Sequence, residues 1–427
     1  MLAPRLELPN APPGLPRSCG LSTAGRGKCR RPGGAGSARF PRSRGGGFGR
    51  RGARGFTLVE LMVGLLLGLL TTLVISEVLS TSEGKKRTLT MGSDAQTNGA
   101  LSLYTLQRDI QAAGYGTANE PAALGCPIKG EFRDPAAPAG TPSIAFSPTL
   151  APVVIEDGAS GAPDRITVLQ SRTPGFSAPV SVTHSHAKTD EFFAVKSSLG
   201  VAAGDLMIVV PAGGAWSVDN WCTVFSVTND GASPATSTTL DFQHVPHVSG
   251  GTSKWNRSSV FPDAGYPAQS YLLNLGTMSL NTYEVDAQKN LVVTSRTAGA
   301  ASTTSTALYP QIVNLQAMYG KDTTADGQVD TYDTVTPTTA AGWQQVLAIR
   351  VAVVARSSQY EKDEVTQTEP LWDVGSGTTI AGTVNCHNGS KCLTLGISSV
   401  PDWKHYRYKV YDTVVPLRNM LWNGAGS

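Results

Sequence analysis

The chain of 427 residues lacks the short motifs that mark common hydrolase and nucleotide sites, since it contains no G-x-S-x-G, P-loop or H-E-x-x-H sequence. It also lacks an internal repeat of about 20–50 residues, which argues against a solenoid or a propeller. Serine, histidine and aspartate are plentiful, but a catalytic triad depends on geometry that abundance does not supply. We therefore expect a protein that is not an enzyme and requires no cofactor.

Basic residues are scarce outside the first segment. Residues 1–55 hold 12 of the 35 lysines and arginines and one acidic residue, which leaves 23 basic and 31 acidic residues in 56–427. A body with a net charge of −8 argues against nucleic-acid binding, because nonspecific binding needs a basic face to neutralise phosphates. At 372 residues, this body is long enough for one large domain or two.

The first 55 residues predict no folded domain. They contain 13 glycines and 7 prolines among scattered arginines, and no apolar run with helix or strand period. Such a segment cannot bury enough surface to offset its chain entropy. It reads as a processed leader, a basic tail or the product of a misassigned start site, and each reading places it outside the fold.

One long apolar run follows directly. Residues 56–75 read FTLVELMVGLLLGLLTTLVI, with Glu60 as the single charge, and would span about 30 Å as a helix. Six arginines lie just upstream of the run and three basic residues follow at 85–87, so the positive-inside rule places the N-terminus in the cytoplasm. No A-x-A cleavage site follows the run. We predict one transmembrane helix over 56–76 with the acidic domain across the membrane.

The start of this run carries a specific motif. The sequence Arg54-Gly55-Phe56-Thr57-Leu58-Val59-Glu60-Leu61-Met62 closely resembles the cleavage and methylation motif of type IV prepilins. In that family a membrane enzyme, the prepilin peptidase, cuts after the glycine and methylates the new N-terminus. The resemblance implies cleavage between Gly55 and Phe56, methylation of Phe56, and Glu60 as the fifth residue of the mature chain.

The lone carboxylate suggests how such helices associate. A charge in an apolar helix costs about 2.5–3.5 kcal/mol at mid-bilayer and is usually functional, although Glu60 is close enough to the start of the span to reach the headgroups. Cleavage would create an amine one turn away, which should pair with Glu60 of a neighbouring subunit and set their register. Gly64 and Gly68 form a small-xxx-small pair that permits close helix packing.

Beyond the span, the pattern predicts more helix and then a β-rich domain. An apolar stripe at 103, 106, 110 and 113 extends the helix to residue 113, with breaks expected at the glycines between 80 and 99. From 114 to 427, β-branched or aromatic runs alternate with loops such as 297–306. The runs are 152–156, 165–169, 191–196, 205–210, 222–228, 271–275, 291–295, 346–354 and 408–415. The expected fold is α+β and type IV pilin-like, with a long helix over 56–113 and a periplasmic β-rich domain over 114–427.

Short pieces of the body resemble the PilW family of minor pilins, and they occur in the family's order. They are Gln107–Tyr115 (QRDIQAAGY), Val313–Gly320 before an Asp/Gly loop, Ala348–Val351, and Val414–Asn419 with its LRN ending. The resemblance implies a minor pilin, in the inner membrane and incorporated into the pilus, that acts in pilus assembly and initiation and hence in twitching motility, adhesion or DNA uptake. The implied partners are other minor pilins, the major pilin, the prepilin peptidase, the inner-membrane assembly platform and a tip adhesin.

Four cysteines lie outside the leader: Cys126, Cys222, Cys386 and Cys392. An even number in an exported domain favours two disulfides, for which three pairings exist. Cys386 and Cys392 close a short loop, so we favour that pair, which leaves Cys126 with Cys222. The alternative is a zinc site built from Cys386, Cys392 and a histidine, although the spacing does not fit a CxxC pair.

A loop rich in aspartate offers a candidate calcium site. Positions 1, 3, 5, 6, 7, 9 and 12 of an EF-hand-like loop are occupied by Asp322, Thr324, Asp326, Gly327, Gln328, Asp330 and Asp333. Threonine at the third position and aspartate at the twelfth weaken the match. A solvated Asp/Gly turn between strands is the favoured alternative.

Two histidine pairs, His184/His186 and His244/His247, could hold a metal only if the fold brought them together. Nothing in the sequence does so, and we expect surface histidines.

Two other classes of protein also carry a single membrane-spanning helix and are alternatives to a minor pilin. One is a pseudopilin of a type II secretion system, since the J-type pseudopilins lie close to the PilW family. The other is a membrane-anchored periplasmic binding protein or enzyme, whose span is only an anchor and whose N-terminus stays intact.

Overall fold

The structure is a computed structural model that describes residues 55–134, 138, 140–173, 178–228, 240–243, 254–297 and 303–424; at 87–92, 160, 240–243 and 422–424 only the backbone is described. The predicted leader before Gly55 and the pair His244/His247 therefore lie outside the described residues. The described chain divides into two units, with the boundary between Thr72 and Leu73.

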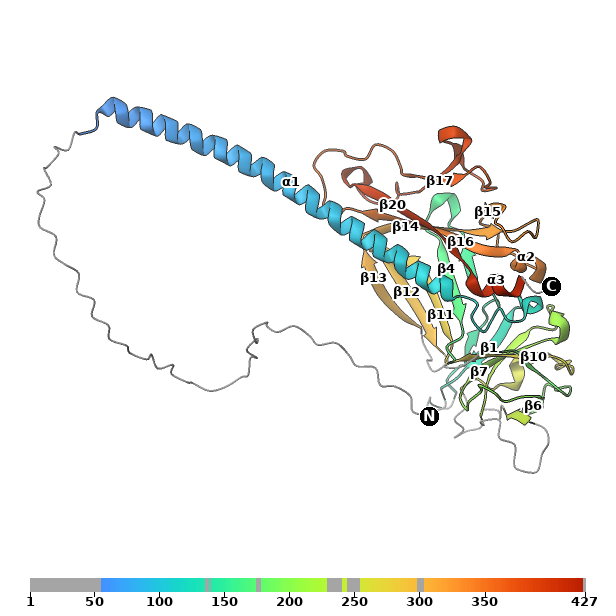
Figure 1. The fold of residues 1–427 in the computed structure, drawn as a ribbon. Coiled ribbons are helices and arrows are strands. Elements are labelled where there is room, and N and C mark those ends of the chain that lie inside the picture. Colours follow the sequence, from blue (N-terminus) through green and yellow to red (C-terminus); the bar gives the residue numbers. More distant parts are fainter. Residues whose placement is uncertain are drawn as a thin grey trace, which may run out of the picture. The chain divides into compact units, whose positions relative to one another are not determined.

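The first element is a single helix of 55 residues, α1 (Leu58–Ala112). It continues without interruption through Gly84, Gly92 and Gly99, so the expected breaks are absent and that prediction was wrong. Each glycine costs only about 1 kcal/mol relative to alanine, which the cooperative hydrogen bonding of a long helix outweighs. The C-terminal part of α1 passes beside β11, β12 and β13 (Figure 1).

Two antiparallel sheets contain most strands of the C-terminal part of the body, and β3 and β4 from earlier in the chain join one of them. The five-stranded sheet has the order β13-β12-β11-β4-β3 and the four-stranded sheet the order β15-β14-β16-β20. Their strands are β3 (Val153–Glu156), β4 (Arg165–Gln170), β11 (Ser279–Val285), β12 (Asn290–Thr297), β13 (Thr304–Pro310), β14 (Ile312–Lys321), β15 (Thr331–Asp333), β16 (Val346–Arg356) and β20 (Tyr408–Pro416). A three-stranded sheet, β17-β19-β18, comprises β17 (Leu371–Gly375), β18 (Val384–Asn385) and β19 (Lys391–Thr394).

The middle of the chain forms a separate six-stranded sheet with the order β2-β1-β8-β7-β10-β5. Its strands are β1 (Ile128–Phe132), β2 (Ile144–Phe146), β5 (Val180–Ser181), β7 (Leu206–Val210), β8 (Cys222–Ser226) and β10 (Tyr271–Gly276). β1 and β8 run parallel, whereas the other pairs are antiparallel. A two-stranded ribbon joins β6 (Phe192–Val195) to β9 (Leu240–Gln243).

Short helices complete the described chain. The α-helices are α2 (Ala340–Gln344) and α3 (Arg418–Gly424), and the 3-10 helices are η1 (Pro121–Ala123), η2 (Ala159–Gly161), η3 (Ala212–Gly214), η4 (Ser258–Val260), η5 (His387–Gly389) and η6 (Trp403–His405).

The sheets bury side chains on both faces. In β16, Val351 and Val353 enter the core beneath α1, whereas Ala352 and Val354 enter a second core against the three-stranded sheet. The α1 side chains Leu106 and Ile110 are fully buried in the first of these cores. The six-stranded sheet likewise separates two cores, because alternate residues of β7 point to opposite faces. The predicted α+β fold, an apolar N-terminal helix before a large β-rich domain, is confirmed.

Candidate functional site

The candidate site begins at the start of α1. Thr57 caps the helix, because its Oγ1 accepts the backbone N–H of Glu60 at 3.2 Å and its carbonyl accepts the N–H of Leu61 at 3.1 Å. Thr-x-x-Glu is the capping-box pattern, in which a glutamate at the third helical position stabilises the cap. The Glu60 carboxylate also lies in the first turn, where the helix dipole favours negative charge. Gly55 and Phe56 precede the helix and have no regular secondary structure.

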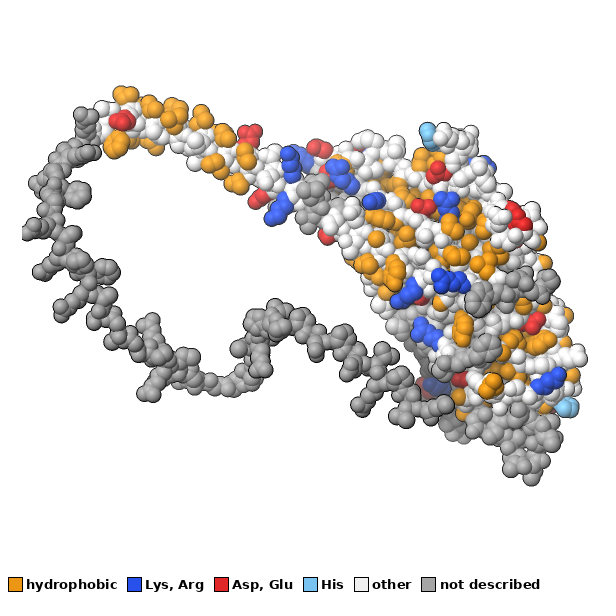
Figure 2. All heavy atoms as spheres, viewed as in Figure 1, with side chains coloured by type: hydrophobic (Ala, Val, Ile, Leu, Met, Phe, Trp, Pro, Cys, Tyr) orange, Lys and Arg blue, Asp and Glu red, His pale blue; other side chains and the backbone are white. Residues whose placement is uncertain are grey.

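The apolar run of α1 is exposed along its whole length. The candidate membrane span Leu58–Lys86 contains an 18-residue window with a mean hydropathy of 2.4, and none of that window is buried. Phe56 is 79% exposed, and hydrophobic side chains line this stretch of the helix in Figure 2. A contiguous apolar surface of this length is unfavourable in water, so it needs a bilayer or other helices around it.

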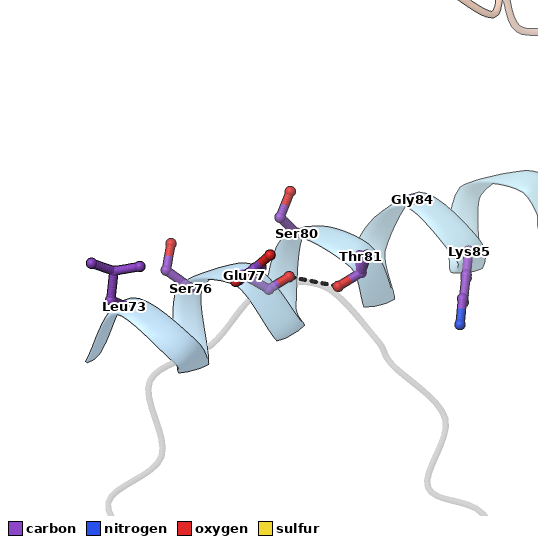
Figure 3. Close-up of a pocket in the computed structure, with 7 residues that line it drawn as sticks. All are labelled: Leu73, Ser76, Glu77, Ser80, Thr81, Gly84 and Lys85. Atoms are coloured by element: carbon purple, nitrogen blue, oxygen red, sulfur yellow. Dashed lines mark hydrogen bonds between the residues drawn. The ribbon is translucent and has the colours of Figure 1, made fainter. Parts of the chain in front are cut away.

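Along α1, an apolar stretch with two open glycine positions is followed by a stretch with polar side chains. A Cβ built at Gly64 or Gly68 meets nothing within 4 Å, so the small-residue face is open in the described chain. Polar side chains begin after the apolar run: Figure 3 shows Ser76, Glu77, Ser80 and Thr81 projecting from one stretch of α1. Thr81 Oγ1 donates to the Glu77 carbonyl at 2.5 Å, which satisfies the hydroxyl within the helix. The shallow surface hollow along this stretch is lined by residues of α1 alone, so it is no enclosed binding pocket.

The last turn of α1 is fixed to the sheet by a buried carboxylate. Asp109 is 8% exposed, and its Oδ2 accepts hydrogen bonds from the Asn281 side-chain amide at 2.9 Å and from the Tyr283 hydroxyl. Ser295 Oγ donates in turn to Asn281 Oδ1 at 2.8 Å. This network holds α1 on β11 and β12.

Both expected cysteine pairs are joined in the structure. The Cys386–Cys392 disulfide closes a loop with a sequence separation of 6, as predicted, and Cys126 is bonded to Cys222 across a separation of 96. Within the described residues, the one group of three metal-type ligands comprises Asp373, Cys386 and Cys392. Because its two sulfurs form the disulfide, this group is not a zinc site in this state.

The aspartate-rich loop is the turn between β14 and β15. Its carboxylates bind the chain itself: Asp322 accepts the N–H groups of Asp326 and Gly327, and Asp330 accepts the N–H groups of Thr323 and Thr324. Asp333 pairs with Lys321 at 2.7 Å. Thr324 Oγ1 donates to Asp330 Oδ2 at 3.1 Å, and Gln328 contributes its N–H to Asp326. The oxygens do not converge on one point, so the calcium hypothesis is unsupported.

Asp164 and His186 are buried titratable groups outside the motif. Burial raises the pKa of Asp164 to about 7, against the lowering effect of the Gly158 and Ala317 N–H groups that its carboxylate accepts. Burial lowers the pKa of His186 to about 4. His186 is 2% exposed, so the expectation of a surface histidine was wrong there; His184 is exposed as expected.

Two parts of the chain match models of known protein families. The model of the prokaryotic N-terminal methylation motif matches residues 50–76, and that of Type IV Pilus-assembly protein W (PilW) matches residues 279–419. Over residues 279–419 the chain is similar to PilW, and over residues 50–76 it is similar to the methylation motif of pilins. No curated protein and no solved structure matches it.

The two matches bear on separate parts of this PilW-like chain. The methylation motif covers the capped start of α1 and its exposed apolar run, and the PilW region runs from the first residue of β11 into α3. Together they confirm the predicted resemblance and indicate a structural component of the pilus. One apolar N-terminal helix with this motif fits a membrane-anchored protein that carries a C-terminal domain.

Sequence reasoning missed two features of the site. The Thr57-x-x-Glu60 spacing is visible in the sequence as a capping-box pattern, and the described chain forms the Thr57 half of it, in which Thr57 Oγ1 accepts the Glu60 N–H. The Asp109 network has no such local signal, since its partners lie more than 170 residues away along the chain.

Proposed function

We propose that this chain is a minor pilin of a type IV pilus that takes part in pilus assembly and initiation. The proposal includes cleavage between Gly55 and Phe56 by a prepilin peptidase and methylation of the new Phe56 amine. In this scheme the span over 56–76 holds the subunit in the inner membrane, with its N-terminus cytoplasmic and its body periplasmic. The observation that carries the proposal is the methylation motif directly before a fully exposed apolar helix.

The mechanism depends on two charges at one end of that helix. After cleavage, the N-terminal amine and the Glu60 carboxylate are separated by one turn. In a bundle of helices away from water, an unpaired charge costs several kcal/mol, so each amine pairs with Glu60 of the adjoining subunit. The open faces at Gly64 and Gly68 allow the helices to approach closely.

The PilW match over 279–419 favours a pilus over the pseudopilus of a type II secretion system. A plain periplasmic binding protein or enzyme with a membrane anchor would retain its leader. Processing of the N-terminus therefore separates this last alternative from the pilin.

Mass spectrometry of the N-terminal peptide tests the proposal. We expect a mature chain that begins at N-methylated Phe56 in cells that carry a prepilin peptidase. Gly55→Val should leave the chain uncut, because the motif requires glycine before the cut, while membrane insertion persists. A Cβ at Gly55 meets nothing within 4 Å, so this variant does not disturb the described fold. An unprocessed wild-type chain in such cells would reduce the protein to an anchored domain.

A further inference from the structure

The turn between β14 and β15 forms one wall of a cavity that the assembly mechanism does not use. The other walls come from η1 with the residues beside it, α2, the start of β16 and α3, and α2 and α3 are neighbours in Figure 1. The cavity has a volume of about 640 Å³ and is half open to solvent. This is enough space for the side chains of a short peptide segment.

Hydrogen bonds fix these walls in place. The Asp322 N–H donates to the Gln345 carbonyl at 2.8 Å, which ties the turn to the end of α2. The Gln344 side-chain amide donates to the Pro121 carbonyl at 3.1 Å and ties α2 to η1. The Leu417 N–H donates to the Leu347 carbonyl at 2.9 Å at the start of α3. Because the cavity is already formed, a ligand would bind without paying to order it.

The lining combines apolar side chains with two aspartates, of which Asp322 is buried and Asp326 is exposed. Leu124, Leu347 and Met420 are among its apolar residues, and Asp322 and Asp326 are its charged ones; among the described residues, no lysine or arginine lines it. The Asp322 carboxylate is used within the turn, where it accepts two backbone N–H groups. Asp326 is exposed, and its Oδ1 accepts one N–H, from Gln328 at 2.9 Å.

We propose that this cavity binds a lysine or arginine side chain presented on an apolar segment of a neighbouring pilin subunit. The aliphatic stem would lie on Leu347 and Met420 while the cationic head pairs with Asp326, since long basic side chains bury their stems and keep their charge at the rim. The absence of a cation from the described lining makes the site complementary to such a group. The inference rests on the proposed function, because it takes the neighbour to be another pilin.

Peptide binding to the mature chain in detergent micelles tests the inference. The probe is acetyl-Leu-Arg-Leu-amide, and its matched control is the same peptide with citrulline, which is neutral and nearly isosteric with arginine. Saturation-transfer NMR should show saturable binding of the arginine peptide and about fivefold weaker binding of the citrulline peptide, as expected for one partly exposed ion pair. Asp326→Asn should remove this difference.

Two further variants check the location of the site. Ala341→Phe places a ring at an exposed lining position and should weaken both peptides. Asp363→Asn changes an exposed aspartate outside the lining and should leave both affinities unchanged. Circular dichroism of each variant verifies that the fold is retained.

The inference is overturned if neither peptide binds, if both bind equally to the wild type, or if Asp326→Asn keeps the difference. The N-terminal mass of the same samples reports on the proposed function separately. A methylated Phe56 without peptide binding would overturn the cavity inference alone, whereas an uncut chain would overturn the pilin proposal.

Discussion

At the scale of single residues, Glu60 has two roles that one substitution separates. Three residues after Thr57 it occupies the capping-box position, which glutamine can also fill; the described chain forms the Thr57 half of this box, in which Thr57 Oγ1 accepts the Glu60 N–H. As the partner of a neighbour's N-terminal amine it must carry a charge, which glutamine does not. The exposed first turn shows no partner for its carboxylate within the described chain, so the structure is compatible with both roles.

We expect Glu60→Gln and Glu60→Ala to block pilus assembly equally. Removing one member of a buried ion pair costs about 3–5 kcal/mol, far more than the cap contributes. Electron microscopy of sheared pili and immunoblots of the pilus fraction measure assembly, and the N-terminal mass verifies that both variants are still cut and methylated. Assembly by Glu60→Gln at the wild-type level would show that the glutamate acts only in the cap.

His186 makes the stability of the body sensitive to acid. Its ring stacks on Phe193 with centroids 3.8 Å apart. Burial lowers its pKa from 6.5 to about 4, so the fold favours the neutral ring. The contribution of this group to stability is fully present above pH 6.5 and is lost as the pH falls towards 4.

Between pH 6.5 and 4 the wild type should therefore lose up to about 3 kcal/mol of unfolding free energy through this histidine. The His186→Phe variant should not lose this part of its unfolding free energy as the pH falls. Urea denaturation at a series of pH values measures the unfolding free energies of the variant and the wild type. His184→Phe, two residues away on the surface, is the matched control and should follow the wild type. The idea fails if His186→Phe and wild type lose stability in parallel.

At the scale of elements, the glycines of α1 show what the sequence pattern could not reveal. Low helix propensity around Gly84 and Gly99 predicted breaks, but propensity alone does not show which glycine is needed for packing. A Cβ at Gly84 meets nothing within 4 Å. At Gly99 it would overlap the ring of Tyr411 in β20 and approach the Ala355 Cβ in β16 to 3.1 Å. At Gly99, α1 therefore lies close against β20 and β16.

Alanine at these two positions should act in opposite directions. Gly84→Ala should raise the stability of α1 by up to about 1 kcal/mol. Gly99→Ala gains the same propensity but should destabilise the body by about 1–3 kcal/mol, because the ring of Tyr411 must move. Thermal unfolding of the mature chain in detergent compares the pair. A higher melting temperature for Gly99→Ala would mean that the helix does not press on β20.

Strands were predictable where β-branched residues cluster, and less so elsewhere. The runs at 165–169 and 346–354 became β4 and β16 because valine and isoleucine dominate them. β14 (Ile312–Lys321) escaped prediction as a strand, since its asparagine, glutamine, alanine and methionine give no alternation. It is buried on both faces, and Asn314 and Gln316 satisfy their amides with backbone carbonyls of distant loops. β13 begins inside the segment expected as a loop, because its pairing with β12 overrides its Ser/Thr composition.

At the scale of the whole molecule, the two family matches cover the methylation motif and residues 279–419. They leave out the region between them, residues 77–278. β3 and β4 lie outside both matches, yet they complete the five-stranded sheet beside β11. The six-stranded sheet lies outside them entirely. Its parallel β1–β8 pair and its antiparallel β7–β10 and β10–β5 pairs arise from contacts between distant segments, which single-sequence patterns do not report. The candidate site was predictable because its motif is local in the sequence. The strand order of the six-stranded sheet was not predictable, because it depends on pairing between distant segments.

The two disulfides should contribute unequally to the stability of the folded body. Cys126–Cys222 closes a loop with a separation of 96 and lies in the core of the six-stranded sheet, where both residues are fully buried. Cys386–Cys392 closes a loop with a separation of 6 on the three-stranded sheet. Chain-entropy arguments give about 4–5 kcal/mol for the first and about 2–3 kcal/mol for the second.

We therefore expect the Cys126→Ala/Cys222→Ala variant to melt well below the Cys386→Ala/Cys392→Ala variant, with the wild type above both. Differential scanning calorimetry of the mature chain without reductant gives the order, and adding reductant should bring the wild type down to or below the less stable variant. Because the larger loop links β1 to β8, its loss should also release the six-stranded sheet first, seen as early hydrogen exchange in β7 and β8. The reverse order of melting would mean that the short loop near β19, and not the long one, limits the stability of the body.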